Sequence, residues 1–408
     1  MKYIRRELED TFLEANKTFK VVLVTGARQI GKSTMLTHLA KNQNRSIVSM
    51  DRQSYRELAK SDPELFFQTF KPPILIDEIQ KCPELFEQIK IICDATDERG
   101  LFWLTGSQSK KLMDHAEESL AGRMGVLRMF PFSTKEKLGL TQYKSIDFSC
   151  SALLKRKKSF PENNIQVTFD MIWHGGMPDT QSLNEKMMAV YFESYIDSYL
   201  LRDAVDDNGI KDTEGFRKFL RACAAFTGQL LNYSDLANAA DISQKTAKEW
   251  IGILQNMGII YLLEPYTHNE LKRMIKKPKL YFCDTGLCAY LSSWTTKGTL
   301  MNGAVSGHYY ENYVIMEMLK NCVYHSSRGR LSFYRDRDAR EIDIIYEDEQ
   351  GIHPLEIKKS AAPNRSEIKK FSLIEKTAQP LGSGGIICMC DQPFPIDRNN
   401  CFIPSNLI

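Results

Sequence analysis

The feature that most constrains the fold is residues 26–33, Gly-Ala-Arg-Gln-Ile-Gly-Lys-Ser, which match the pattern G-x-x-x-x-G-K-[ST]. The match follows an apolar stretch at 20–25, expected to be a strand, and opens residues 32–41, expected to be a helix. Its glycines allow the backbone to curl so that N–H groups point at phosphate oxygens, and the helix N-terminus adds partial positive charge. The alternative is a glycine-rich turn before a helix, without a ligand.

In such a loop, Lys32 can reach the β- and γ-phosphates of ATP, and the Ser33 hydroxyl can complete the shell of Mg²⁺. We therefore predict ATP and Mg²⁺ as cofactors. The residues predicted to line the nucleotide are Gly26, Ala27, Arg28, Gln29, Ile30, Gly31, Lys32, Ser33 and Thr34.

A pair of acidic residues, Asp77 and Glu78, follows the apolar stretch 74–76. Ligands of open α/β sheets bind at the carboxyl ends of the strands, where this pair would lie. We expect Asp77 to hold Mg²⁺ through water. Glu78 would polarise the attacking water, a group that a nucleotide hydrolase needs and a mere binder does not.

Two further segments carry candidate catalytic side chains. Thr105 or Ser107, at the end of the next strand, could contact the γ-phosphate and the water, or could simply cap the following helix. Arg123 precedes the last strand of this region. It could neutralise charge at the γ-phosphate of its own chain or of a neighbouring chain, worth about 10³–10⁵ in rate for an arginine finger, or form a surface salt bridge. The predicted catalytic set is Glu78, Lys32, Arg123 and Ser107.

The first 130 residues alternate short apolar runs with helical patterns. Nearly continuous apolar strands separated by helices are typical of a parallel sheet covered on both faces, so the fold class is α/β. The expected strands are 20–25, 46–50, 73–77, 101–105 and 126–130. The expected helices are 32–41, a helical stretch to about 70, and 83–98.

Together, these motifs resemble the AAA-superfamily ATPases of bacteria and archaea. More narrowly, the chain is similar to a subgroup of ATP-binding proteins whose C-terminal half is a domain of unknown function with nuclease-like character. The resemblance implies ATP binding and an ATPase. It continues through four segments for which residue type suggests no chemical role: 175–178, 195–203, 279–287 and 311–314.

Residues 233–254 read as two short helices joined by a tight turn, with Ser234 and Ser243 as expected caps. A strand-like run at 259–263 would make the unit a winged helix. Its second helix would expose Gln244, Lys245 and Lys248 to phosphates or base edges of duplex DNA, and residues 272–279 add five cations. The alternative is a module for packing or protein contact.

A later constellation resembles the D…E-x-K core of restriction-endonuclease-like folds. Asp343 and Glu356 would bind a second divalent metal, Lys358 would position or deprotonate water, and Glu311 on the preceding helix would be a fourth ligand or orienter. The alternative is a degenerate nuclease fold kept for binding. Pro354 suggests an edge position or a bulge.

Composition sets limits on these hypotheses. Fifty-four basic against 51 acidic residues leave a net charge of +3, so any electrostatic footprint must be local. No apolar run approaches the ~20 residues that span a bilayer, and the N-terminus lacks the apolar stretch of a secretory signal. We expect a cytoplasmic location, no membrane partner, and ten reduced cysteines without a C-x-x-C pair; a homo-oligomer stays open.

The predicted organisation is an AAA-type P-loop ATPase domain, a helical linker or lid region, a winged-helix domain and a restriction-endonuclease-like α/β domain. Their predicted bounds are 1–135, 136–215, 216–300 and 301–408. The functional hypothesis is ATP-driven handling of DNA by the C-terminal module. Two alternatives remain: an ATP-gated, metal-dependent nuclease, and a non-catalytic ATP-dependent switch that binds a protein partner.

Overall fold

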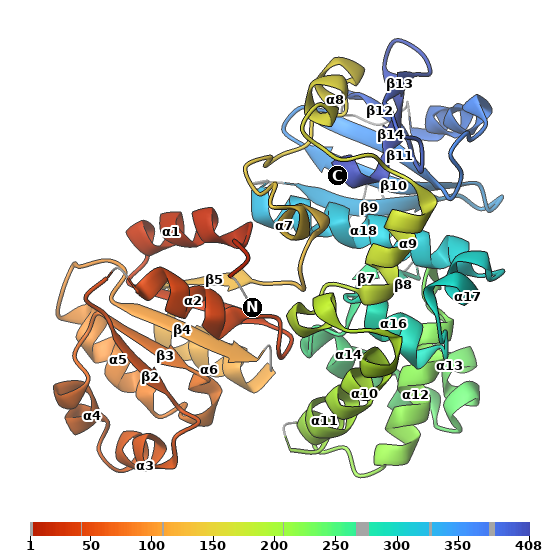
Figure 1. Cartoon of the computed structure of the whole chain (residues 1–408). Helices are drawn as coiled ribbons and strands as arrows, with labels where there is room; N and C mark the ends of the chain where they lie inside the picture. Colours follow the sequence, from red (N-terminus) through yellow and green to blue (C-terminus); the bar gives the residue numbers. More distant parts are fainter. Residues whose placement is uncertain are drawn as a thin grey trace. The chain divides into compact units, whose positions relative to one another are not determined.

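The computed structural model describes residues 3–41, 43–107, 110–206, 208–266, 277–325, 329–374 and 380–408 (Figure 1). The chain forms two compact units, which are treated separately below. Unit 1 comprises Met1–Pro131 and Asn256–Ile259; unit 2 comprises Phe132–Gln255 and Ile260–Ile408. Apart from residues 256–259, the three segments predicted after residue 135 fall within unit 2.

Unit 1 is built on a five-stranded parallel sheet with the strand order β2-β3-β4-β1-β5. This confirms the predicted parallel sheet and places β1, which leads into the glycine-rich loop, between two neighbours. The strands are β1 (Val21–Gly26), β2 (Ser46–Ser49), β3 (Ile74–Asp77), β4 (Phe102–Ser107) and β5 (Met124–Arg128).

Helices cover both faces of this sheet (Figure 1), and they bury the side chains of its inner strands on both sides. On one face, Leu23, Ile76 and Leu104 pack in one core with α3 to α6. On the other face, the ring of Phe12 on α1 meets Trp103 edge to face at 4.8 Å. The helices are α1 (Leu8–Thr18), α2 (Lys32–Ala40), α3 (Gln53–Ser61), α4 (Pro63–Thr69), η1 (Ile79–Lys81), α5 (Leu85–Asp94) and α6 (Lys110–Leu120).

The structure refines the helix predictions for unit 1. The helical stretch expected to reach residue 70 is two helices, because Pro63 starts a new helix capped by the Asp62 side chain. The helix expected at 83–98 spans only Leu85–Asp94. Helices α1 and α6 were not predicted.

Unit 2 begins with a series of helices: α7 (Thr134–Leu138), α8 (Cys150–Lys157), α9 (Ile165–His174), η2 (Pro178–Ser182), α10 (Glu185–Tyr195), the π-helical turn η3 (Ile196–Leu200) and α11 (Leu201–Asp206). Residues 185–206 are therefore helical throughout, although a π turn interrupts the α-helix.

The next part of unit 2 combines helices with a small antiparallel sheet in the order β6-β8-β7. Helices α13 and α14 are the two short helices predicted within residues 233–254. Ser243 caps α14 by accepting the Thr246 N–H at 3.0 Å, as expected, whereas Asn232 rather than Ser234 caps α13. The elements are α12 (Thr213–Ala225), β6 (Gln229–Leu230), α13 (Tyr233–Ala240), α14 (Gln244–Asn256), β7 (Ile260–Leu263) and β8 (Lys279–Phe282).

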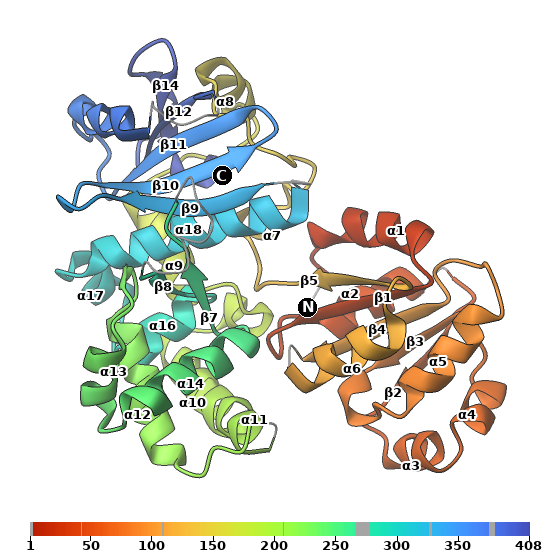
Figure 2. The same ribbon diagram turned by 180° about the vertical axis from the view of Figure 1, so that it is seen from behind.

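The last part of unit 2 is a six-stranded mixed sheet in the order β13-β14-β12-β11-β10-β9, with the largely buried helix α18 against it (Figure 2). Its elements are α16 (Thr285–Leu291), α17 (Lys297–Asn302), α18 (Ser306–His325), β9 (Arg330–Arg335), β10 (Glu341–Asp348), β11 (Gly351–Lys358), η4 (Arg365–Ile374), β12 (Gly384–Cys388), β13 (Phe394–Pro395), β14 (Asn400–Pro404) and η5 (Ser405–Leu407).

The expectation that Pro354 marks an edge strand is wrong. Strand β11 lies between β10 and β12, and the bulge in this sheet falls in the β10–β9 pairing between Ile342 and Ile345. The parallel pairing of β11 with β12 begins only at Leu355, so the missing N–H of Pro354 precedes that ladder.

All ten cysteines are free thiols, as predicted. Within the described ranges, none of the helices has the length and apolar character that a bilayer crossing requires.

Candidate nucleotide-binding site

The glycine-rich loop leaves the carboxyl end of β1 and enters α2 at Lys32. Gly26 has a φ of 147°, and a Cβ there would lie 2.3 Å from the carbonyl oxygen of Met129, so only glycine fits. Gly31 has a φ of 93°. Ala27 and Ile30 are buried, whereas Thr34 is exposed on α2. The loop therefore has the tight, backbone-lined form that suits phosphate oxygens.

Lys32 lies inside this loop. Its side chain is buried, and its ammonium donates to the carbonyl oxygens of Gly26 at 3.0 Å and Ala27 at 2.7 Å. A lysine held within the curl of the loop is placed where the negative charge of a triphosphate would lie.

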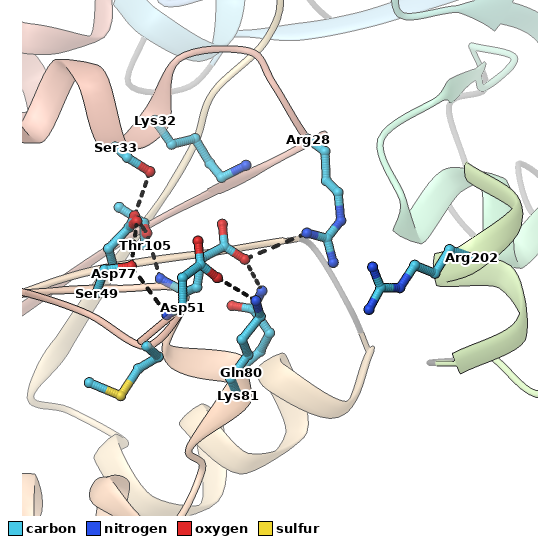
Figure 3. Close-up of polar contacts among 12 residues, drawn as sticks. Arg28, Lys32, Ser33, Ser49, Asp51, Asp77, Gln80, Lys81, Thr105 and Arg202 are labelled. Carbon is cyan, nitrogen blue, oxygen red and sulfur yellow. Dashed lines mark hydrogen bonds and ion pairs between the residues drawn. The ribbon is translucent and has the colours of Figure 1, made fainter. Parts of the chain in front are cut away.

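Asp77 is the hub of the site, at the carboxyl end of β3 (Figure 3). Its Oδ1 accepts hydrogen bonds from the hydroxyls of Ser33 and Thr105, and its Oδ2 accepts from Ser49 at 3.5 Å. These four side chains come from the carboxyl ends of β2, β3 and β4 and from the first turn of α2. Hydroxyl and carboxylate oxygens are the ligands that Mg²⁺ prefers, so Ser33 and Asp77 fit the cation that accompanies ATP.

Glu78 follows Asp77 in a left-handed backbone conformation, with a φ of 58°. Its N–H donates to the Thr105 hydroxyl at 3.1 Å, and its Oε2 accepts from Gln80 Nε2 at 2.5 Å. Arg28 Nη1 lies 3.8 Å from the same oxygen. A strained residue held by neighbours on both its backbone and its side chain is typical of a functional site.

Thr105 and Ser107, the two candidates at the end of β4, both lie at the site. Thr105 touches Asp77 and Glu78 at once, a linking role that sequence reasoning did not assign. Ser107 pairs with Gly26 in the strand register. Its hydroxyl is buried and has no hydrogen-bond partner among the described residues, so it is available to a ligand.

Arg123 lies at the end of the parallel sheet opposite to the glycine-rich loop. It precedes β5, whose Met124 pairs with Val21 at the start of β1. Val21 lies five residues, about 16 Å, before Gly26. Arg123 forms an ion pair with Asp94, with Nε–Oδ1 at 2.6 Å. Arg123 thus forms the salt bridge that was the alternative, and it lies too far from the glycine-rich loop to contact a γ-phosphate bound to the same chain. A contact with nucleotide bound to a neighbouring chain stays a prediction.

Arg6 supports the loop, and sequence reasoning missed it. This buried arginine donates to the carbonyl oxygens of Ile30 at 2.7 Å and Phe130 at 2.6 Å. It therefore ties the glycine-rich loop to the chain that follows β5. No local sequence signal separates Arg6 from the neighbouring Arg5, which is exposed and pairs with Asp10.

The predicted nuclease residues lie close together in unit 2, and lysine side chains form ion pairs with two of their carboxylates. Glu356 Oε1 accepts from Lys358 and Lys370, each at 2.8 Å. Asp343 Oδ2 accepts the Ile357 N–H at 2.8 Å. Burial, followed by the nearby carboxylates Glu356 and Glu311, raises the pKa of Asp343 well above its usual range.

Lys279 forms an ion pair with Glu311, the remaining carboxylate of this cluster. Its ammonium lies 2.8 Å from Glu311 Oε1 and 2.5 Å from Glu341 Oε1, and Tyr281 donates to Glu311 at 2.6 Å. Burial alone would lower the pKa of Lys279, but Glu311 and Glu341 outweigh it and raise the pKa. Over the described part of the chain, no group of three or more His, Cys, Asp or Glu is arranged to hold a metal ion. The second divalent metal at these residues therefore stays a prediction.

The predicted DNA-contact residues Gln244, Lys245 and Lys248 are exposed on α14, whose opposite face is buried. The basic cluster at 272–279 is only partly visible, because residues 272–276 lie outside the described ranges. Lys277 is exposed, but Lys279 is buried against its two glutamates and cannot serve as a phosphate contact.

Two of the segments without a predicted role, 175–178 and 279–287, pack against each other. Asp284 caps α16 through the Leu287 N–H at 2.8 Å and accepts the Gly176 N–H at 2.6 Å. A Cβ on Gly175 would lie 2.3 Å from the Asp284 carboxylate, and one on Gly286 would lie 2.9 Å from the His174 backbone. These motifs are therefore explained by packing.

Family profiles match three parts of the chain. Residues 18–138 match an AAA domain, residues 166–298 match a domain of unknown function (DUF8612), and residues 306–408 match another (DUF4143). The first match coincides with the sheet and site described above. Residues 18–138 thus match an AAA domain that carries the glycine-rich loop of a P-loop nucleotide site.

The relatives found by sequence are uncharacterized proteins. Those of Mycobacterium tuberculosis and Mycobacterium bovis are 26% identical over 408 residues, covering 99% of this chain and 84% of theirs. One of Haemophilus influenzae is 24% identical, covering 80% of this chain and 79% of its own. Among solved structures, a Walker-type ATPase of Pyrococcus abyssi matches with a TM-score of 0.43 and 15% identity, covering 70% of this chain and 95% of that one.

Proposed function

We propose that the AAA-type domain of residues 18–138 hydrolyses ATP, with Glu78 orienting the attacking water. The observation that carries this proposal is the Thr105 hydroxyl, which donates to Asp77 and accepts from the backbone of Glu78. One side chain thereby couples the predicted Mg²⁺ ligand to the predicted catalytic carboxylate. A site built only to bind nucleotide has no need of a fixed carboxylate beyond the metal ligand.

Each remaining residue then has a defined task. The loop N–H groups and Lys32 bind the phosphates, and Ser33 and Asp77 hold the cation. When bound, Mg²⁺ supplies positive charge to the phosphate oxygens as negative charge shifts toward the leaving group. Glu78 accepts a hydrogen bond from the water and orients it toward the γ-phosphorus.

The second part of the proposal is that α13, α14 and the β6-β8-β7 sheet form a winged helix that contacts duplex DNA. In support, α14 buries Ala247, Trp250 and Leu254 and leaves Gln244, Lys245 and Lys248 exposed along one side. Exposed amide and ammonium groups on the second helix of such a unit suit phosphates and base edges.

For the C-terminal sheet we propose binding without cleavage. Asp343 and Glu356 lie together, as a nuclease requires, but Lys358, Lys370 and Lys279 neutralise this cluster internally. Lys358 and Lys370 compete with a divalent metal for Glu356 through its Oε1, while its Oε2 accepts no hydrogen bond among the described residues. The alternative of an ATP-gated, metal-dependent nuclease is therefore the weaker candidate, and we derive no step through a metal there.

ATP turnover measured with and without duplex DNA tests the coupling. We expect DNA to stimulate turnover, and we expect its affinity to fall steeply between 50 and 200 mM salt because phosphate contacts release counterions. The Lys245→Ala/Lys248→Ala double variant should bind DNA more weakly with a shallower salt dependence, while its DNA-free turnover stays unchanged. Turnover that is indifferent to DNA would instead favour an ATP-dependent switch that acts on a protein partner.

A further inference from the structure

Arg28 is the third residue of the glycine-rich loop, and its side chain points across the site. Its Nη1 lies 3.8 Å from Oε2 of Glu78, and both side chains are mostly buried, at 25% and 16% exposed. Figure 3 shows the Arg28 guanidinium directed at the carboxylate that Gln80 also contacts. An arginine of the loop itself therefore reaches the carboxylate proposed to orient water.

The other partner of this carboxylate is fixed. Gln80 donates to Glu78 Oε2 at 2.5 Å, and Gln80 Oε1 is buried without a hydrogen-bond partner among the described residues. A Cβ on Gly106 would lie 3.0 Å from that oxygen, so the amide is packed against β4. Of the two contacts to Glu78, the longer one to Arg28 is thus the easier to exchange.

The position of Arg28 in the loop would bring its guanidinium near the γ-phosphate of a bound nucleotide. The attacking water must lie between Glu78 and the γ-phosphorus, within hydrogen-bond reach of the carboxylate. Arg28 arises from the loop that wraps the phosphates and ends beside that carboxylate. Its guanidinium presents a planar fork of donors that matches two phosphate oxygens at once.

We propose that Arg28 is the arginine that stabilises the transition state, supplied in cis. Without nucleotide it pairs with Glu78; with ATP bound it moves to the γ-phosphate oxygens and leaves Glu78 free to orient water. This inference rests on the proposed hydrolysis of ATP. It also fills, within one chain, the role predicted for Arg123, which lies at the opposite end of the strands from the loop.

The reaction balances with these groups. The water oxygen bonds to the γ-phosphorus as the bond from that phosphorus to the β–γ bridging oxygen breaks. The proton released by the water passes to Glu78 and then to solvent. ADP leaves with the bridging oxygen, and inorganic phosphate leaves with the water oxygen. Arg28 exchanges no proton, since its guanidinium stays charged throughout.

The test compares Arg28→Ala, Arg28→Lys and the control Arg99→Ala, an exposed arginine in the turn before β4. Single-turnover ATP hydrolysis and fluorescence titrations with ATP and ADP are measured for each. We expect Arg28→Ala to lower the rate about 10³-fold, in the range for a removed arginine finger, and to weaken ATP but not ADP. Arg28→Lys should recover only part of the rate, and added guanidinium should partly rescue Arg28→Ala.

Two results would overturn the inference: an Arg28→Ala rate equal to wild type, or equal losses of ATP and ADP affinity, which would indicate a purely structural role in the loop. A wild-type chain that binds ATP without hydrolysing it would refute the proposed function instead. Even then, the ratio of ATP to ADP affinity decides on Arg28: a ratio lowered in Arg28→Ala supports its contact with the γ-phosphate, and an unchanged ratio contradicts it.

Discussion

Replacing Lys32 with alanine should abolish ATP binding at micromolar nucleotide. The ammonium is buried in the loop and held by two carbonyl oxygens, 3.0 and 2.7 Å away. Two hydrogen bonds from a charged donor to phosphates contribute about 1.5–3 kcal/mol each. The dissociation constant measured by calorimetric titration should therefore rise roughly 10²- to 10⁴-fold.

Lys20→Ala is the matched control for this change. Lys20 donates to the carbonyl oxygen of Cys93 at 2.8 Å. It directly precedes β1, so it lies at the end of the strand opposite to the glycine-rich loop. This variant should bind ATP like wild type. Circular dichroism shows whether Lys32→Ala is folded, and a folded Lys32→Ala chain with unchanged affinity would contradict the assignment of the loop.

Replacing Lys279 with alanine should destabilise unit 2 by about 3–5 kcal/mol, the cost of leaving buried charges without their partner. The Lys279 side chain is 6% exposed, and its removal takes away the ammonium between Glu311 and Glu341, of which only Glu341 keeps another ion pair, with Arg335. Urea unfolding followed by circular dichroism measures the change in the free energy of unfolding.

Lys277→Ala provides the comparison. Lys277 is exposed and lies two residues before Lys279, in the segment that leads into β8. Its effect should stay within about 0.5 kcal/mol, as for other surface substitutions. A loss below about 1 kcal/mol for Lys279→Ala would show that the carboxylates do not depend on this lysine. Their description as internally neutralised would then be wrong.

Much of unit 1 could be predicted because its signals are local. The apolar runs around Leu23 and Ile76, and the loop that joins the first run to α2, each lie within a few consecutive residues. The roles of Thr105 and Arg123 are different in kind, because they depend on which end of which strand meets the loop. Only the register that pairs Gly26 with Ser107 and Val21 with Met124 decides them.

The difference between local signals and contacts formed only on folding also explains the wrong predictions for Lys279 and Pro354 in unit 2. Lys279 looks like one cation of a basic surface cluster in the sequence. Its burial follows from Glu311 and Glu341, which are distant along the chain and meet it only in the folded state. Pro354 likewise reads as an edge residue, whereas the order of strands places β11 inside the sheet.

The most direct test of the central claim, that Asp77, Glu78 and the glycine-rich loop form one hydrolytic site, is single-turnover ATP hydrolysis by Glu78→Gln with ATP affinity measured in parallel. The amide keeps the shape of the side chain but cannot accept the proton of the water. We predict an affinity within a few-fold of wild type and a rate lower by about 10²–10⁴, the usual contribution of a general base. Hydrolysis at the wild-type rate would contradict the claim.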